Sequence, residues 1–159
     1  MRRRSTDSAN ELRFAVALSW SGAGREGAGR IAGEDVELEY SVPASMGGRG
    51  SGTSPEELLV AAVGTCYSAT LQGVLRRAGL PATEVRVGAV GSVSGYPRNA
   101  RFERLTVTPT IVGGDPDRRA EYERAALAAH GRCFIGRTVA GVVDYRVGRV
   151  TVEPERAAA

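Results

Sequence analysis

The two cysteines are the residues of this chain whose type and position most directly suggest chemistry. Among 159 residues, only Cys66 and Cys133 carry a thiol. Cys66 lies within the apolar run AAVGTCYSATL, and Cys133 comes just after the run AAHGR. Two thiols can pass electrons to a substrate by cycling between the dithiol and the disulfide. The pattern therefore indicates a dithiol that reduces another molecule.

The surroundings of Cys66 also allow a purely structural role. On a helix, Cys66 shares a face with apolar residues such as Val63 and Ala69, which predicts that its sulfur points toward packed side chains. Burial raises the pKa of a thiol, so a reactive Cys66 needs a nearby cation or hydrogen-bond donors. Since a small buried residue is the common fate of a free cysteine, the local pattern leaves both roles open.

The elements that must position these thiols begin with strands and a long helix. Apolar residues alternate over 12–20, which predicts a half-buried strand, and alternate again over 36–42 after a glycine-rich break. Ser54 followed by Pro55 is a strong helix start, and the apolar run beyond it predicts a helix that ends at Gly79.

The second half repeats the order of strands, helix and strands. Residues 84–94 and 102–112 are rich in Val, Thr or Ile and predict two strands, with Pro109 indicating an edge position. A second helix is predicted from Asp115 to the residues before Cys133, and two β segments over about 138–153 follow. This order favours an α+β fold with helices gathered on antiparallel sheets.

Length and composition predict one soluble domain over residues 11–153, flanked by a candidate disordered extension (1–10) and a C-terminal tail (154–159). The 21 basic and 18 acidic residues are interspersed, which does not suggest nucleic-acid binding. The apolar run after the charged N-terminus is too short for a signal peptide or a membrane span. We expect a cytoplasmic protein with no membrane partner, where a cysteine pair favours catalysis or metal binding over a structural disulfide.

A longer pattern around both thiols resembles a known family. The run SVPASMGGRGSGTSPEELLVAAVGTC, with AGREG before it and AHGRC after it, resembles the OsmC/Ohr family of organic hydroperoxide reductases and leans toward the Ohr branch. The resemblance covers nearly the whole chain. It implies an OsmC-like fold, in which antiparallel sheets pack on a long central helix and a second helix, and an intertwined homodimer.

The resemblance also implies roles for individual residues. Cys66 matches the peroxidatic cysteine, which attacks the peroxide and becomes a sulfenic acid, and Cys133 matches the resolving cysteine, which closes a disulfide with it. Arg25 in GREG matches the arginine of the active site, and Glu56 in SPEEL matches the carboxylate that holds this arginine. An arginine suits this role because it stays protonated and offers forked donors to thiolate and peroxide.

Helix geometry bears on the assembly. Ten residues along one helix separate Glu56 from Cys66 by roughly 15 Å, too far for both to meet one guanidinium directly. Our hypothesis is that two long helices cross at a two-fold axis, so that the Arg25–Glu56 pair of one chain lies beside Cys66 of the other. Small residues that would permit close approach of the helices are Ala61, Ala62, Gly64 and Ala69.

The remaining candidates concern the substrate and the reductant. Phe134 follows Cys133 where the family commonly has a proline. Phe134, Tyr67 and Leu71 are candidates to line an apolar pocket, which would favour bulky organic hydroperoxides over hydrogen peroxide. The resemblance implies recycling by a dithiol such as dihydrolipoamide or a lipoylated protein, with no organic cofactor and no metal.

Other interpretations of the same residues stay open. Arg25 in isolation resembles an ordinary surface arginine, and Glu56 would stabilise the start of its helix through the helix dipole. His130 and Cys133 form an H-x-x-C pattern that could join Cys66 in a zinc site, although such scattered ligands are a weak signal, and His130 is better explained by capping its helix or by local hydrogen bonding. On the same fold, a redox sensor or a small-ligand binding module would use the thiols without turnover.

Overall fold

A computed structural model describes residues 11–155, which belong to two compact units, Met1–Pro55 and Glu56–Ala159. Each unit is described by itself, and the single domain over residues 11–153 stays a prediction. The extension predicted for residues 1–10 lies outside the described residues, as do residues 156–159 of the predicted tail.

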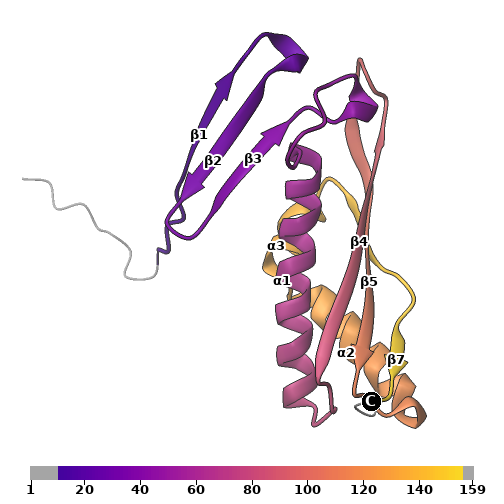
Figure 1. Cartoon of the computed structure of the whole chain (residues 1–159). Helices are drawn as coiled ribbons and strands as arrows, with labels where there is room; N and C mark the ends of the chain where they lie inside the picture. The colour runs from indigo at the N-terminus through magenta and orange to yellow at the C-terminus, as the bar shows by residue number, and fades with distance from the viewer. Residues whose placement is uncertain (1–10, 156–159) are drawn as a thin grey trace, which may run out of the picture. The chain divides into compact units, whose positions relative to one another are not determined.

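The N-terminal unit is a three-stranded antiparallel meander. It contains β1 (Val16–Ser21), β2 (Ala28–Gly33) and β3 (Glu37–Ser41), hydrogen-bonded in that order (Figure 1). Strand β2 lies in the glycine-rich segment that was expected only to break the pattern. Gly29 explains the difference, since a Cβ at this position would collide with the ring of Tyr40 on β3. Glycine in this strand therefore permits the close approach of an aromatic side chain.

The first strand corrects the expectation of half burial over residues 12–20. It begins at Val16, and all six of its residues are exposed. Val16, Leu18 and Trp20 alternate along it as predicted, and Trp20 contacts Tyr40 with ring centroids 5.6 Å apart. The alternation thus marks an apolar face that no described residue of the chain covers.

The second unit contains the long helix, a mixed sheet and two further helices. Its elements are α1 (Pro55–Arg77), β4 (Glu84–Ser94), β5 (Arg101–Val112), α2 (Arg119–Arg132), α3 (Phe134–Val139), β6 (Asp144–Val147) and β7 (Thr151–Glu153). Helix α1 lies alongside the long hairpin of β4 and β5 (Figure 1). The helices and strands predicted before residue 132 are confirmed here, whereas α3 occupies the beginning of the segment predicted as β over 138–153.

Helix α1 starts and ends where its sequence signals predict. Pro55 opens it, Glu56 and Glu57 stand in its first turn, and Arg77 closes a basic last turn, which suits the helix dipole. Gly79 follows with a φ of 63°, the left-handed conformation common just after a helix.

The sheet of the second unit is mixed. Strands β4 and β5 are antiparallel, as expected, whereas β6 and β7 both run parallel to β5. Strand β5 is therefore central, and the edge position predicted from Pro109 is wrong for the strand as a whole. Pro109 lies between the part of β5 that pairs with β6 (Arg104–Val107) and the part that pairs with β7 (Thr110–Val112), where neither strand bonds to it. A missing N–H is tolerated at such a gap.

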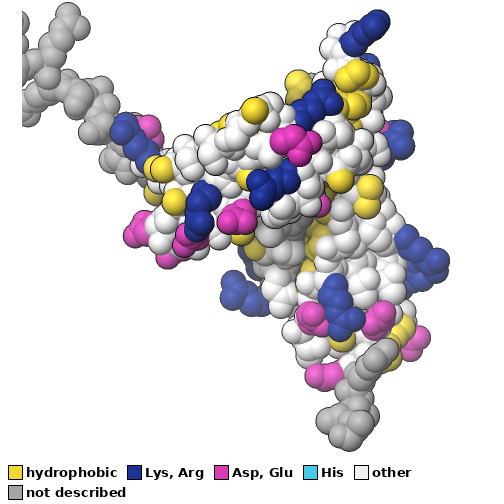
Figure 2. Space-filling model, turned by 45° about the horizontal axis from the view of Figure 1, so that its top comes forward, with side chains coloured by type: hydrophobic (Ala, Val, Ile, Leu, Met, Phe, Trp, Pro, Cys, Tyr) yellow, Lys and Arg dark blue, Asp and Glu magenta, His cyan; other side chains and the backbone are white. Residues whose placement is uncertain are grey.

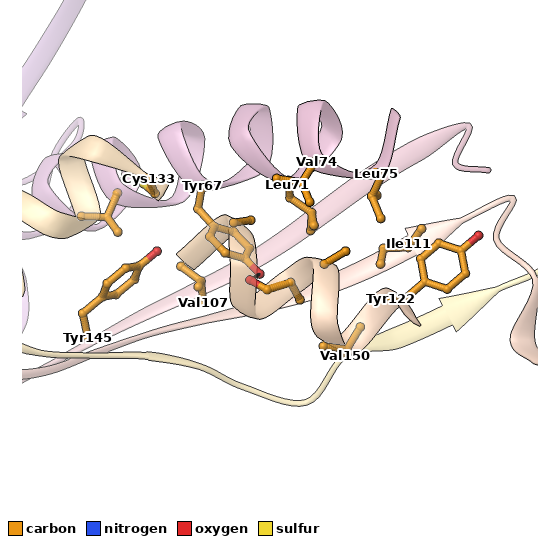
Figure 3. Packing of buried hydrophobic residues seen from close by; sticks show 14 of the residues in the cluster. Tyr67, Leu71, Val74, Leu75, Val107, Ile111, Tyr122, Cys133, Tyr145 and Val150 are labelled. Atoms are coloured by element: carbon orange, nitrogen blue, oxygen red, sulfur yellow. Dashed lines mark hydrogen bonds between the residues drawn. The ribbon is translucent and has the colours of Figure 1, made fainter. Parts of the chain in front are cut away.

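The core of this unit lies between α1, β5 and α2. Residues such as Leu71 on α1, Val107 on β5 and Tyr122 on α2 are fully buried in one cluster (Figure 3). Small residues bring α1 close to β4, because a Cβ at Gly64 would lie 3.3 Å from Cβ of Ala89. Gly64 therefore serves packing within the chain, while its predicted companions Ala61, Ala62 and Ala69 are exposed.

Helix α1 is also, within residues 11–155, the one helix long and apolar enough to cross a membrane by length and composition. Its buried face builds the core described above, so this property is a weak indication of a span. Only 28% of its most apolar window is buried within the chain. The exposed apolar residues of α1 include the small Ala61, Ala62 and Ala69.

The charged side chains form exposed ion pairs. Asp144 meets Arg104 and Arg146, and Arg119 meets Glu123 one turn away on α2. Figure 2 shows basic and acidic side chains interspersed over one face. Such solvent-exposed pairs contribute little to stability.

Candidate functional site: a buried and a half-buried thiol beside an apolar cleft

Cys66 lies on α1 at the border of its buried stripe. The stripe contains Val63, Tyr67 and Leu71, which are fully buried, whereas Cys66 is only half-buried. Helical spacing places Cys66 one position away from this stripe, so its thiol packs against the core cluster without being sealed inside it. The thiol is therefore partly accessible to solvent and to a substrate.

Cys133 occupies the junction between α2 and α3 and is fully buried. Its N–H donates to the Ala129 carbonyl at 2.8 Å, which ends α2, and its Sγ accepts the N–H of Gly136 at 3.4 Å, which begins α3. The junction thus fixes the backbone at Cys133.

The fold brings the two thiols together from distant parts of the chain. Both are free, and Cys66 lies close enough to Cys133 to act on it through a hydrogen bond. Burial raises the pKa of Cys133, the Gly136 N–H lowers it, Cys66 raises it further, and Tyr145 lowers it. Cys66 thus packs against the same core cluster that contains Cys133.

An open, mostly apolar cleft of about 660 Å³ borders Cys66. It is lined by Ala62, Thr65, Cys66, Ala69, Thr70, Phe134 and Ile135, from α1 and from the start of α3. Phe134 is 64% exposed and lies in this cleft as predicted. Tyr67 and Leu71, the other two predicted pocket residues, are placed elsewhere: both are fully buried in the core, because they lie on the inner stripe of α1.

Buried phenols surround Cys133. Tyr67 donates its hydroxyl to the Ala126 carbonyl at 3.2 Å, and burial followed by the nearby Cys133 raises its pKa. Tyr145 on β6 is similarly buried, and its pKa is raised first by burial and then by Cys133. Nothing in the sequence marks Tyr145 as a site residue. It shares one face of its strand with Val143 and Val147, as an ordinary core residue does.

His130 stands behind Tyr145. The two rings stack with centroids 4.3 Å apart, and Nε2 of His130 lies 3.1 Å from the Tyr145 carbonyl oxygen. This contact is local hydrogen bonding near Cys133, one of the two explanations of His130 favoured above. No three His, Cys, Asp or Glu side chains gather as a metal site within the described residues.

The predicted arginine belongs to the N-terminal unit, and the predicted carboxylate to the start of α1. Arg25 belongs to the N-terminal unit, in the single turn Gly24–Glu26, and its Nη1 donates to the Met46 carbonyl at 2.8 Å. Glu56 stands in the first turn of α1, and its Oε2 is buried with no hydrogen-bond partner within residues 11–155.

Comparisons with known proteins agree with this fold. Residues 48–147 match the family described as OsmC-like protein. The chain is 27% identical over 137 residues to the uncharacterized protein YmaD of Bacillus subtilis, covering 84% of this chain and 91% of that protein.

Two solved structures show the same fold. An OsmC-like protein of unknown function from Vibrio cholerae superposes with a TM-score of 0.74 at 16% identity, over 87% of this chain and 99% of the other. The organic hydroperoxide resistance protein OhrB of Bacillus subtilis gives 0.62 at 22% identity, over 86% and 98%. The chain belongs to the OsmC family, and its fold is the OsmC-like α+β fold.

Proposed function

We propose that the protein is a thiol-dependent peroxidase that reduces organic hydroperoxides to alcohols. Membership of the OsmC family supports a peroxide-related redox function in general. The observation that carries the specific proposal is the pairing of half-buried Cys66 with buried Cys133 beside an apolar cleft. In this reaction the Cys66 thiolate attacks the distal peroxide oxygen, the alcohol leaves, and Cys66 becomes a sulfenic acid. Cys133 then displaces water from that sulfur and closes the disulfide.

The lining of the cleft supports an organic substrate. Cys66 borders a surface that is contributed by Ala62, Ala69, Phe134 and Ile135. This surface offers apolar contacts to the hydrocarbon group of an organic hydroperoxide, but few hydrogen bonds to the second hydroxyl group of hydrogen peroxide. An alkyl or aryl hydroperoxide would gain affinity from these contacts, whereas hydrogen peroxide would not. Phe134 is the largest side chain available for this purpose.

Activation of Cys66 requires a cation, and we assign this role to Arg25. Glu56 holds the guanidinium, which accounts for a buried carboxylate oxygen that otherwise has no partner among the described residues. Because Glu56 and Cys66 are separated by roughly 15 Å of helix, the Arg25–Glu56 pair acts on Cys66 across an intertwined homodimer. The exposed apolar faces of β1 and α1 support such an assembly.

The oxidised protein needs a reductant to turn over. A small dithiol such as dihydrolipoamide, free or carried on a lipoylated protein, can attack the disulfide and leave by forming its own ring disulfide. This exchange suits the cytoplasm, where thiols are kept reduced. No organic or metal cofactor takes part in the proposed cycle.

Consumption of cumene hydroperoxide with dihydrolipoamide as reductant tests the proposal. We expect many turnovers in the parent protein and none in Cys66→Ser. A Cys133→Ser protein should still consume one equivalent of peroxide and keep a sulfenic acid that dimedone labels. If the parent protein consumed no more than one equivalent under these conditions, it would act as a stoichiometric sensor instead. Equal rates in the parent and Cys66→Ser would remove the thiol mechanism altogether.

A further inference from the structure

The Tyr145 hydroxyl is a buried polar group that the fold leaves without a hydrogen bond of normal geometry. The side chain is only 8% exposed, and within residues 11–155 its oxygen has no such partner, although it lies close enough to Cys133 to lower the pKa of that thiol through a hydrogen bond. Buried hydroxyls almost always find a partner, because burying one alone costs folding free energy. A hydroxyl placed in this way beside a thiol can strengthen its hydrogen bond to the sulfur when the thiol ionises.

The position of this hydroxyl points to Cys133. Figure 3 shows the Tyr145 ring extending from β6 toward Cys133. A Cβ at Gly136 would lie 3.0 Å from the Tyr145 hydroxyl oxygen, and the N–H of the same glycine donates to Cys133 Sγ. The bare Cα of Gly136 thus leaves room for the phenol beside the N–H that already contacts the sulfur.

The chemistry of the phenol fits a donor to a negative sulfur. Burial and the neighbouring Cys133 raise the pKa of Tyr145, which favours the protonated phenol, the form that can donate. In the opposite direction, a hydrogen bond from Tyr145 lowers the pKa of Cys133. The two other phenols in the core donate to backbone carbonyls, Tyr67 to Ala126 and Tyr122 to Pro81, whereas within residues 11–155 the Tyr145 hydroxyl has no such acceptor.

We propose that Tyr145 is a positioning residue whose hydroxyl, together with the Gly136 N–H, receives the Cys133 thiolate as Cys133 attacks oxidised Cys66. The inference rests on the proposed peroxidase function. In this step the sulfur–sulfur bond forms, the sulfur–oxygen bond of the Cys66 sulfenic acid breaks, and the hydroxide leaves as water with the proton that Cys133 released. Tyr145 keeps its own proton throughout.

The direct test measures the ionisation of Cys133 without any peroxide. In a Cys66→Ser background, Cys133 is the single thiol, and its titration can be followed by NMR of cysteine labelled with ¹³C at Cβ. Tyr145→Phe should raise the pKa of Cys133, because a donor to the charged form is lost. Tyr122→Phe removes a buried hydroxyl at the other end of the core and should leave this pKa unchanged (Figure 3).

A kinetic measurement then connects the hydroxyl to the reaction. After one equivalent of cumene hydroperoxide, disulfide closure in Tyr145→Phe should slow by about threefold for each unit by which the pKa rises. The thiolate fraction falls about tenfold per unit, while the nucleophilicity of the remaining thiolate rises about threefold. The rate of the first step, oxidation of Cys66, should stay unchanged.

The outcomes separate this inference from the proposed function. A Cys133 pKa that is unchanged or lower in Tyr145→Phe would overturn the role of the hydroxyl, whatever the peroxidase activity. A parent protein that consumes no peroxide would overturn the proposed function, while the titration would still decide whether Tyr145 acts on Cys133. Phenylalanine keeps the ring and removes a hydroxyl that has no hydrogen bond of normal geometry within the described residues, so the variant should unfold at the same denaturant concentration as the parent or a higher one.

Discussion

The two thiols differ in environment, and the difference supports the order in which they act in the proposed reaction. Cys66 borders an open cleft, whereas Cys133 is fully buried behind it. A peroxide arriving from solvent meets Cys66 first. Cys133, held by Gly136 and shielded from solvent, is suited to react only with a group that Cys66 carries. The structure thus favours the same division of labour that the sequence resemblance implies.

The raised pKa of Cys133 predicts how disulfide closure depends on pH. Because burial favours the neutral thiol, the thiolate is a minor form at neutral pH and increases about tenfold per pH unit until the pH reaches the raised pKa. The rate of closure after a single equivalent of peroxide should therefore rise steadily with pH on the alkaline side of neutrality. Rapid acid quenching and thiol counting would follow it, and a rate independent of pH there would contradict the prediction.

Gly136 is predicted to tolerate no side chain. A Cβ there would lie 2.8 Å from Cζ of Tyr145, a buried ring with no room to move, so Gly136→Ala should destabilise the reduced protein by about 1–3 kcal/mol. Gly131→Ala is the matched control: this glycine lies in α2 with no heavy atom near its absent Cβ. The control should be neutral or stabilising by up to about 1 kcal/mol. Urea denaturation of both variants measures the difference, and equal stabilities would refute it.

At the scale of elements, the sequence predicts helices well because their signals are local. Pro55 and Gly79 delimit α1 closely, and alternation locates β4 and β5. The sequence pattern does not predict β2, where Gly29 is needed because a Cβ would collide with the Tyr40 ring. It does not predict α3 either, which Cys133 caps and whose Gly136 packs against Tyr145. These features depend on contacts with residues outside the segment itself, which its own hydrophobic pattern does not reveal.

The same limit applies to the site residues. The two cysteines are visible in the sequence because thiols are rare in it. The sequence does not show which side of α1 borders the cleft. Tyr67 and Leu71 lie within five positions of Cys66 on the helix, and yet both face the core. Apolar side chains near a reactive group are equally compatible with a pocket and with a core. Only the packing of α1 on β5 and α2 decides between them.

The core position of Leu71 makes a prediction about α1. Leu71→Ala should destabilise the protein by about 2–5 kcal/mol, since it leaves a cavity among fully buried neighbours. Leu127→Ala, on the exposed side of α2, removes the same atoms from a side chain that is 63% exposed and should change stability little. Thermal or urea unfolding compares the two. A Leu71→Ala protein of normal stability with a raised KM for cumene hydroperoxide would instead place Leu71 in the substrate pocket.

At the scale of the whole molecule, apolar surface remains uncovered in both units. On β1, Val16, Leu18 and Trp20 are exposed on a strand whose alternation is typical of a packed face. On α1, 28% of the apolar window is buried within the chain, and the exposed apolar residues include the small Ala61, Ala62 and Ala69. Exposed apolar surface of this kind is typical of protein interfaces. In the proposed homodimer, a second copy of the chain would cover this surface and would also supply the Arg25–Glu56 pair of the proposed site.

The homodimer is therefore the last prediction. Sedimentation velocity at micromolar concentration should show a dimer, and Leu18→Glu should shift it toward monomer, because a carboxylate would be buried without a partner at the interface. Leu127→Glu places the same charge on another exposed leucine, on α2, and should leave the dimer intact. The peroxidase activity should fall with the dimer fraction in Leu18→Glu, since each Cys66 depends on Arg25 of the other copy. A monomeric protein with full activity would exclude the shared site and return Arg25 to the chain that carries Cys66.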